Sequence, residues 1–110
     1  MSYSEYVPEH ERPVISALLT AALKDGNTVS VFDCEEWSIK RSTSIRAIQA
    51  VLGATEEDLL VILNSAGGKI GQFYLIYNNG SVGDPMVVIA DYSSNDFCEN
   101  LYRPLWEKYS

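Results

Sequence analysis

The first periodic segment of the chain has apolar residues at helical spacing. Its stripe consists of Val14, Ile15, Leu18, Leu19, Ala22 and Leu23. Residues at this spacing share one face of an α-helix. Pro13 suits the first helical turn, where a missing N–H has no partner to lose, and Gly26 suits the position just past a helix end. The pattern predicts a helix over residues 13–25, after a lead of residues 1–12 whose polarity allows flexibility.

Two short segments of alternating residues follow this helix. Residues 28–32 alternate Val29 and Val31 with their neighbours, and residues 37–40 show the same alternation. A period of two is typical of a β-strand with one buried face. The four polar residues between the segments suit a hairpin loop, so we expect an antiparallel pair.

A second, shorter helix is predicted after this hairpin. Ile45, Ile48 and Leu52 share one helical face. A serine or threonine at residues 42–44 can cap the start, and Gly53 suits the position after the end. The spacing indicates a helix of about ten residues.

The next part of the chain predicts three consecutive strands. Residues 59–63 are apolar without alternation, which is typical of a strand that is covered on both faces. Residues 70–77 alternate along their whole length, and residues 86–92 form a third extended segment. The connections are too short for a crossover helix, so we expect an antiparallel meander.

The last predicted element is a helix that contains a proline. Phe97, Leu101 and Leu105 recur every fourth residue after a capping serine or asparagine at residues 93–95. Pro104 interrupts this pattern, and an internal proline kinks or breaks a helix. We therefore expect the helix to end near Tyr102, with a short turn beyond it.

These elements follow the order α-ββ-α-βββ-α in a single domain of residues 1–110. An α+β fold with a five-stranded antiparallel sheet, and helices packed mainly on one face, can bury all the apolar stripes together. The element order resembles that of profilin-like and roadblock-like domains. This is a likeness of topology, and topology alone implies no function.

The chain is acidic, with 15 aspartates and glutamates, 8 lysines and arginines, and a net charge of −7. Such a charge repels nucleic acid and anionic membranes and favours cationic partners. No apolar run is long enough to span a bilayer, and the N-terminus lacks the basic start and apolar stretch of a secretory signal. We expect a cytoplasmic protein with a protein partner of basic surface, and no direct binding to nucleic acid or membrane.

Residues that carry catalysis or hold metals are scarce. The chain has one histidine, His10, and two distant cysteines, Cys34 and Cys98, without metal-ligand spacing. Cys34 lies in the acidic turn of residues 33–36, where neighbouring carboxylates raise the pKa of a thiol and blunt its reactivity. We therefore expect no enzyme, cofactor or metal site, and two thiols that stay reduced.

One small basic cluster adjoins the acidic turn. It consists of Lys40, Arg41 and Arg46. Three positive charges are too few for a duplex-binding surface on a chain of this net charge. We expect these residues to pair locally with the acidic turn of residues 33–36.

The sheet is expected to have an uncovered face. Alternation divides residues 70–77 into one set with Gln72, Tyr74 and Ile76 and another with Phe73, Leu75 and Tyr77. Three modest helices cannot cover both faces, so one set would form an apolar and aromatic patch of the kind that marks association surfaces. Homodimerisation through that face is the leading structural expectation.

The function that these observations favour is that of a small non-enzymatic regulatory protein acting through protein–protein contacts. We predict a partner surface in which Tyr74 and Ile76 supply apolar contact area and acidic residues at the loop ends form the rim. The rim residues are Glu35, Glu36, Asp84 and Asp91.

Two alternatives stay open. The chain is similar in size and acidity to small phage- and plasmid-encoded inhibitors, including many anti-CRISPR and anti-restriction proteins, which implies a nucleic-acid mimic. Its phosphate surrogates would be Glu56, Glu57, Asp58, Asp96 and Glu99. The second alternative is a small-molecule binder or enzyme, with a pocket between the sheet and the last helix near Asp91, Tyr92 and Cys98.

Overall fold

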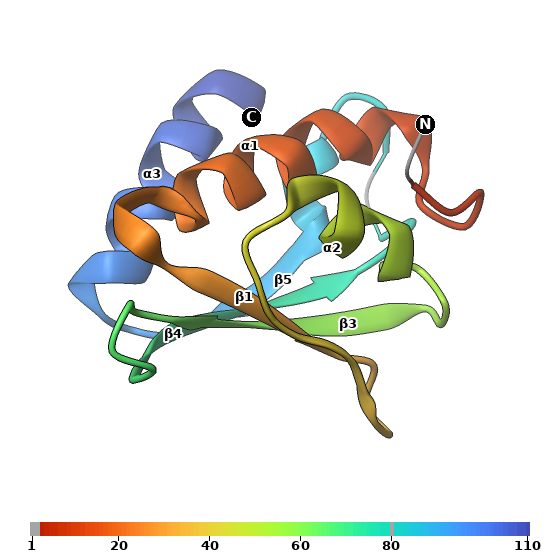
Figure 1. The fold of residues 1–110 in the computed structure, drawn as a ribbon. Coiled ribbons are helices and arrows are strands. Elements are labelled where there is room, and N and C mark those ends of the chain that lie inside the picture. The colour runs from red at the N-terminus through yellow and green to blue at the C-terminus, as the bar shows by residue number, and fades with distance from the viewer. Residues whose placement is uncertain (1–2, 80) are drawn as a thin grey trace.

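The computed structural model describes residues 3–79 and 81–110, which form one five-stranded antiparallel sheet with three α-helices on one of its faces (Figure 1). The strands are β1 (Thr28–Phe32), β2 (Trp37–Ser42), β3 (Glu57–Leu63), β4 (Lys69–Ile76) and β5 (Ile89–Tyr92). The α-helices are α1 (Arg12–Ala22), α2 (Ile45–Val51) and α3 (Asp96–Tyr109), and the short 3₁₀ helices are η1 (Glu9–Glu11), η2 (Lys24–Gly26) and η3 (Pro85–Val88). The predicted fold class and element order are confirmed. Within the described residues, no helix is long and apolar enough to cross a bilayer.

The strands lie in the order β2-β1-β3-β4-β5, with every neighbouring pair antiparallel. The β1–β2 and β3–β4 hairpins therefore meet where β1 lies beside β3, which makes β3 the central strand. Val31 pairs with Leu60, and Leu60 pairs with Phe73 on the next strand. Because paired residues of an antiparallel sheet point to the same face, this row defines the face that packs under the helices.

The hydrophobic core lies between this face and the helices. Ile15, Leu18 and Leu19 of α1 are fully buried against it. The alternation in β4 assigns Phe73 and Leu75 to the same core, as their full burial shows. Burial of apolar area, at about 25 cal/mol per Å², is the main stabilising contribution of this layer.

The helix α3 runs through Pro104 and ends at Tyr109, so the prediction of a break near Tyr102 is wrong. A proline removes one bond to the carbonyl four residues earlier. Pro104 and Asn100 are both exposed, so water can satisfy the carbonyl that loses its partner. Leu105 is buried in the core and holds the second half of the helix against the sheet.

The predicted strand over residues 86–92 is shorter than expected. Only Ile89–Tyr92 pairs with β4, and the preceding residues form η3 with Pro85 in its first turn. Met86 and Val88 are buried in the core from this short helix. The apolar run therefore reflects packing of η3, which a simple alternation count reads as strand.

The polar lead is folded onto the domain from Tyr3 onward, and residues 1 and 2 lie outside the described residues. Val7 is fully buried. Arg12 donates from Nε to the carbonyl of Val7 at 2.9 Å and from its second guanidinium nitrogen to that of Ser4 at 3.2 Å. The buried carboxylate of Glu11 accepts from the N–H of Asn78 at 3.0 Å. These contacts tie the lead to the loop after β4.

Candidate functional site

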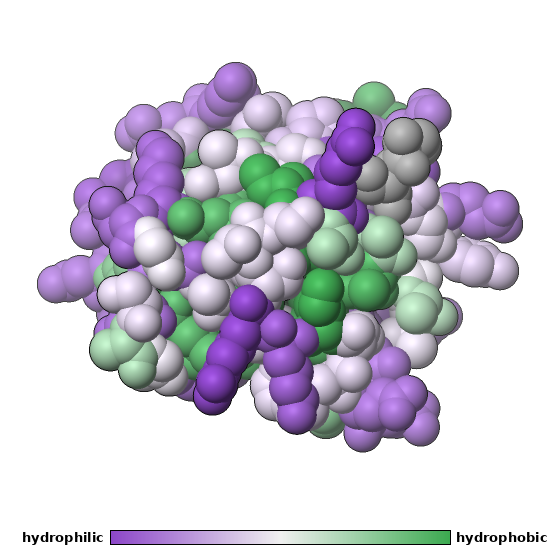
Figure 2. Space-filling view, in the orientation of Figure 1, coloured by the Kyte–Doolittle hydropathy of each residue, from purple (hydrophilic) through white to green (hydrophobic). Residues whose placement is uncertain are grey.

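The face of the sheet that points away from the helices, called the open face below, carries no helix in the described part of the chain (Figure 1). Strand pairing places thirteen residues on it: Thr28, Ser30, Phe32, Trp37, Glu57, Leu59, Val61, Leu63, Lys69, Gln72, Tyr74, Ile76 and Asp91. A surface cavity of about 560 Å³ lies on this face between β2 and β4. Figure 2 shows the molecule from the side, in the orientation of Figure 1, where hydrophilic side chains surround several hydrophobic areas.

The central strand makes the open face apolar. Leu59, Val61 and Leu63 of β3 point to this face, while the residues between them belong to the core. An antiparallel strand with one solvated face normally alternates apolar and polar residues. The sequence pattern of β3 predicts a strand that is covered on both faces. In the described chain the helices cover one face, and on the other face Val61 is buried by its neighbours while Leu59 and Leu63 remain partly exposed.

Aromatic residues extend the apolar surface to both sides of β3. The rings of Phe32 and Trp37 meet in a tilted arrangement with centroids 5.1 Å apart, and Trp37 remains 44% exposed. Tyr74 pairs with Leu59 on the other side of the central strand. Trp37, Phe32, Leu59 and Tyr74 thus form one row across four neighbouring strands.

At one end of the open face, the carboxylate of Glu57 accepts hydrogen bonds from the side chains of Cys34 and Tyr74. The thiol of Cys34 donates to Glu57 Oε1 at 3.3 Å, and a hydrogen bond to Glu57 raises the pKa of Tyr74 to about 12. The same bonds lower the pKa of Glu57. Partial desolvation, together with Glu57 and nearby aspartates, raises the pKa of Cys34, in the predicted direction. Cys34 is therefore poorly suited to act as a nucleophile.

The acidic turn between β1 and β2 is held by its own backbone. Asp33 Oδ1 accepts from the N–H groups of Glu36 at 2.8 Å and of Glu35 at 2.9 Å. These bonds stabilise the ionised carboxylate and lower its pKa. The side chains of Glu35 and Glu36 are left exposed, so the turn presents its negative charge to solvent.

The structure separates the six predicted site residues into three places. Tyr74 and Ile76 share the open face with Asp91, which pairs with Tyr74. Glu35 and Glu36 lie at the hairpin tip beyond β1. Asp84 lies away from the open face, in a groove with Met86 of η3 and Tyr102 and Trp106 of α3.

Sequence reasoning missed several residues of the open face. Trp37 and Phe32 were assigned to strands but not to a surface, because the two-residue period does not say which side the helices cover. The predicted strand begins at residue 70, so Lys69 was not placed on any surface. It lies on the open face at the start of β4, where it pairs with Leu63 and donates to Gln72. The unbroken apolar run of β3 was the one signal that could have identified this surface.

The local pairing expected for the basic cluster is absent from residues 3–79 and 81–110. No ion pair there joins Lys40, Arg41 or Arg46 to the turn of residues 33–36, and the pair given by the structure is His10 with Glu11 at 3.8 Å. The residues Lys40 and Arg41 instead line the cavity of the open face. Their charges therefore remain available to another molecule.

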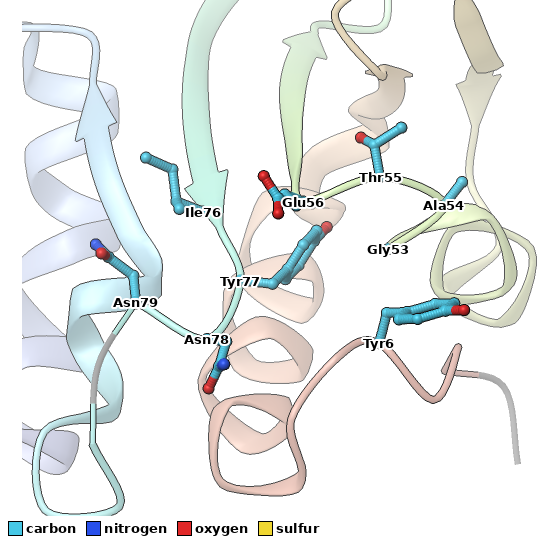
Figure 3. A pocket seen from close by; sticks show the side chains of 9 residues that line it. All are labelled: Tyr6, Gly53, Ala54, Thr55, Glu56, Ile76, Tyr77, Asn78 and Asn79. Atoms are coloured by element: carbon cyan, nitrogen blue, oxygen red, sulfur yellow. The ribbon is translucent and has the colours of Figure 1, made fainter.

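A second cavity, of about 650 Å³, lies at the other end of the domain. In Figure 3 the ring of Tyr77 points toward the loop that contains Gly53 and Thr55. Tyr6, which belongs to the N-terminal segment, lines the same cavity. Its lining contains one ionisable acid, Glu56, and neither histidine, cysteine nor lysine. The described residues of this lining therefore supply one carboxylate and no basic side chain beside it.

Beneath this cavity, Asp58 is a buried carboxylate. Its Oδ2 accepts from the hydroxyl of Tyr77 at 2.6 Å and from the N–H of Gly53 at 2.9 Å. Burial raises the pKa of Asp58, and burial together with the nearby carboxylate also raises the pKa of Tyr77. The hydrogen bonds of Asp58 connect the loop before β3 to the end of β4, so Asp58 has a structural role.

The acidic residues proposed as phosphate surrogates do not share a face. Asp58 is buried. Glu56 and Glu57 precede or begin β3, whereas Asp96 and Glu99 begin α3, whose cap residue Asn95 bonds to Ile70 near the start of β4. The start of β3 and the start of β4 are opposite ends of the sheet, so the two acidic groups lie apart.

The third candidate was a pocket between the sheet and the last helix near Asp91, Tyr92 and Cys98. Side chains fill the space between the sheet and α3 there, whereas Asp91 and Tyr92 line a surface cavity of about 210 Å³ with Gln72, Tyr74 and Ser93. Cys98 is buried against Gly71, and Tyr92 stacks between Phe73 and Tyr102 with centroid distances of 5.7 and 4.6 Å. Burial raises the pKa of Cys98. Cys98 and Cys34 are both free thiols on different parts of the fold. In the described residues, no three histidine, cysteine, aspartate or glutamate side chains gather as a metal site.

Comparisons with known proteins complete this description. No protein-family model, curated protein or solved structure matches the chain.

Proposed function

We propose that this protein is a small non-enzymatic binding protein that acts through protein–protein contacts on the open face of its sheet. The observation that carries the proposal is the composition of β3. Leu60 and Ile62 fill the core, and Leu59, Val61 and Leu63 make the opposite face apolar as well. A strand of this kind is typical of a sheet covered on both sides, and a partner would supply the second cover.

The residues around β3 have the chemistry of an interface. Trp37, Phe32 and Tyr74 add aromatic area, and aromatic residues are enriched at the centres of protein interfaces. Tyr74 and Ile76 keep the anchoring role expected for them, with Asp91 at the edge of the same face. Glu35 and Glu36 extend the acidic part of the rim, which suits a partner with basic residues there.

The chemistry of the remaining candidates supports binding over catalysis. Both thiols have raised pKa values, and the buried Asp58 is bonded to Tyr77 and Gly53. The net charge of −7 disfavours nucleic acid and anionic membrane as the bound surface. A protein surface with an apolar centre and basic groups at its rim is the partner that fits these features.

Site-specific photocross-linking in cells that make the protein tests this proposal. The probe p-benzoylphenylalanine in place of Tyr74 is expected to form a covalent adduct with a protein, because Tyr74 lies within the proposed interface. The same probe in place of Trp106, an exposed aromatic of α3, is the matched control and should give no such adduct. Absence of any protein adduct at Tyr74, in a variant with unchanged thermal unfolding, would refute the proposed function.

A further inference from the structure

The charges around the open face are divided between the two ends of its strands. One end, where β3 finishes at Leu63 and β4 begins, carries Lys69, and the adjoining part of β2 carries Lys40 and Arg41. At the other end, Glu57 begins β3 opposite Ile76, and the hairpin turn with Glu35 and Glu36 lies beside it. The apolar row of Leu59 and Val61 lies between a basic end and an acidic end.

These two groups do not neutralise each other within the chain. In residues 3–79 and 81–110, no ion pair joins Lys40, Arg41 or Lys69 to Glu35, Glu36 or Glu57. The separation along the strands explains this, because the two groups lie on opposite sides of the apolar row. Each group is left to attract an opposite charge on another molecule.

A surface with one basic and one acidic end is complementary to itself when a second copy is turned end for end. Resting on the function proposed above, we propose that the open face binds a second copy of this chain. The two sheets stack face to face about a two-fold axis that runs across the strands. An axis along the strands would instead place each basic end on the other basic end and each acidic end on the other acidic end, which is repulsive.

The proposed axis determines which residues meet. It lies at the level of Leu60, midway between Leu59 and Val61, so Leu59 of each copy packs on Val61 of the second copy. Because this axis places each strand over the same strand of the second copy, Lys69 lies over the second copy's Ile76, next to the second copy's Glu57. At the β2 edge the axis passes near Ile39, so Lys40 and Arg41 lie over the second copy's Ser38 and Trp37, next to the second copy's acidic turn. Every contact occurs twice, as an isologous interface requires.

The shape of the β1–β2 hairpin suits this arrangement. In Figure 1 the hairpin extends below the rest of the sheet, on the side away from the helices. Its acidic tip therefore reaches toward the plane of a second sheet, which packs about 10 Å away in a face-to-face stack. The result is a four-layer particle with two sheets inside and helices on both outer faces, in which β3 is covered on both sides.

A charge-reversal experiment tests the dimer and its symmetry together. One variant carries Lys40→Glu with Arg41→Glu, and the other carries Glu35→Lys with Glu36→Lys. Sedimentation is expected to show a dimer for the unmodified chain, weakened by salt. Each variant alone should associate about tenfold or more weakly, because like charges then face each other. An equimolar mixture of the two variants should recover the dimer, because each acidic group then faces a basic group.

Two controls keep the experiment decisive. The variant Lys24→Glu with Lys108→Glu makes the same change in net charge as Lys40→Glu with Arg41→Glu, but on exposed residues outside the open face, and should dimerise like the unmodified chain. Arg41 has a left-handed backbone, with φ of 52°, so Lys40→Glu alone is used if the double variant unfolds at lower temperature.

Two results would overturn the inference. One is a chain that stays monomeric across the micromolar range. The other is a mixture of the two variants that fails to recover a dimer formed by the unmodified chain. If the chain stays monomeric, an adduct between the Tyr74 probe and a different protein would leave the proposed binding function standing and exclude the second copy as the partner. If the unmodified chain dimerises but the mixture does not, the proposed symmetry of the dimer is excluded.

Discussion

Gly71 lies where β4 passes closest to α3, and its missing side chain allows that contact. A Cβ built on Gly71 would collide with the Sγ of Cys98 and lie 3.1 Å from Cδ2 of Phe97. Cys98 is fully buried, so it has no room to move outward. The small residue on β4 and the thiol on α3 are therefore a matched pair in the core.

We predict that Gly71→Ala lowers the free energy of unfolding by about 1–3 kcal/mol, the usual cost of overpacking a core. The added Cys98→Ala substitution should recover part of this loss, because it removes the atom that collides. Urea unfolding of both single variants and the double variant measures the coupling. Equal losses with and without Cys98→Ala would contradict the assigned contact.

Asp58 makes stability depend on pH in a direction that follows from its environment. Burial raises the pKa of Asp58, so the folded chain holds this proton more tightly than the unfolded chain does. The associated stability is complete below the unfolded pKa of about 4. It is lost as the pH rises through the higher folded pKa.

We predict that Asp58→Asn removes this loss of stability at higher pH, because asparagine has no carboxyl group to ionise. The stability of the variant relative to the unmodified chain should therefore increase as the pH is raised from about 4 toward neutrality. Chemical unfolding at a series of pH values gives the difference curve, in which contributions from other carboxylates cancel. A difference that is constant with pH would mean that Asp58 titrates normally in the fold.

Among the elements, α3 tolerates a proline because of where that residue faces. Pro104 is exposed and Leu105 beside it is buried. The helix therefore keeps its apolar contacts and loses one solvent-facing hydrogen bond. We predict that Pro104→Ala stabilises the protein by about 1–3 kcal/mol, because alanine restores the N–H and favours the helix.

Thermal or urea unfolding checks this gain, with Arg103→Ala as a control on the neighbouring exposed position. The control should change stability by less than about 0.5 kcal/mol. If Pro104→Ala gives no gain, the helix end after Tyr102 contributes little to stability, and the continuous helix would not be the stable arrangement in solution.

Local patterns identify most of the elements and leave their assembly open. Alternation in residues 28–32 and the helical stripe from Val14 to Leu23 depend on neighbours in sequence, so both elements could be predicted. The end of α3 could not, because it depends on whether Pro104 faces water. The run of residues 86–89 reads as strand because apolar residues in a packed 3₁₀ helix have no distinct period.

The candidate site was predictable only in part for a similar reason. Tyr74 and Ile76 were recognised as one side of a strand, and the run at residues 59–63 as covered on both faces. The two ends of the open face depend on pairing between distant segments. Lys69 lies at the same end of the sheet as the basic residues of β2 because of the register of β1, β3 and β4. No local sequence pattern contains this register.

At the scale of the whole molecule, the fold has two layers, one of helices and one formed by the sheet. Its helices cover one face of the sheet, and the apolar residues of β3 make the other face suited to a second layer. The central claim is that the open face is where this protein associates, and Tyr74 lies within it beside Leu59. A charge at Tyr74 should prevent association, while an apolar ring of similar size should permit it.

Sedimentation velocity of the chain with Tyr74→Glu or Tyr74→Phe tests this claim most directly. We predict a dimer for the unmodified chain and for Tyr74→Phe, and a monomer for Tyr74→Glu with its circular dichroism spectrum unchanged. A Tyr74→Glu variant that still dimerises would contradict the assignment of association to the open face, and an unmodified chain that remains monomeric at every concentration would contradict association with a second copy.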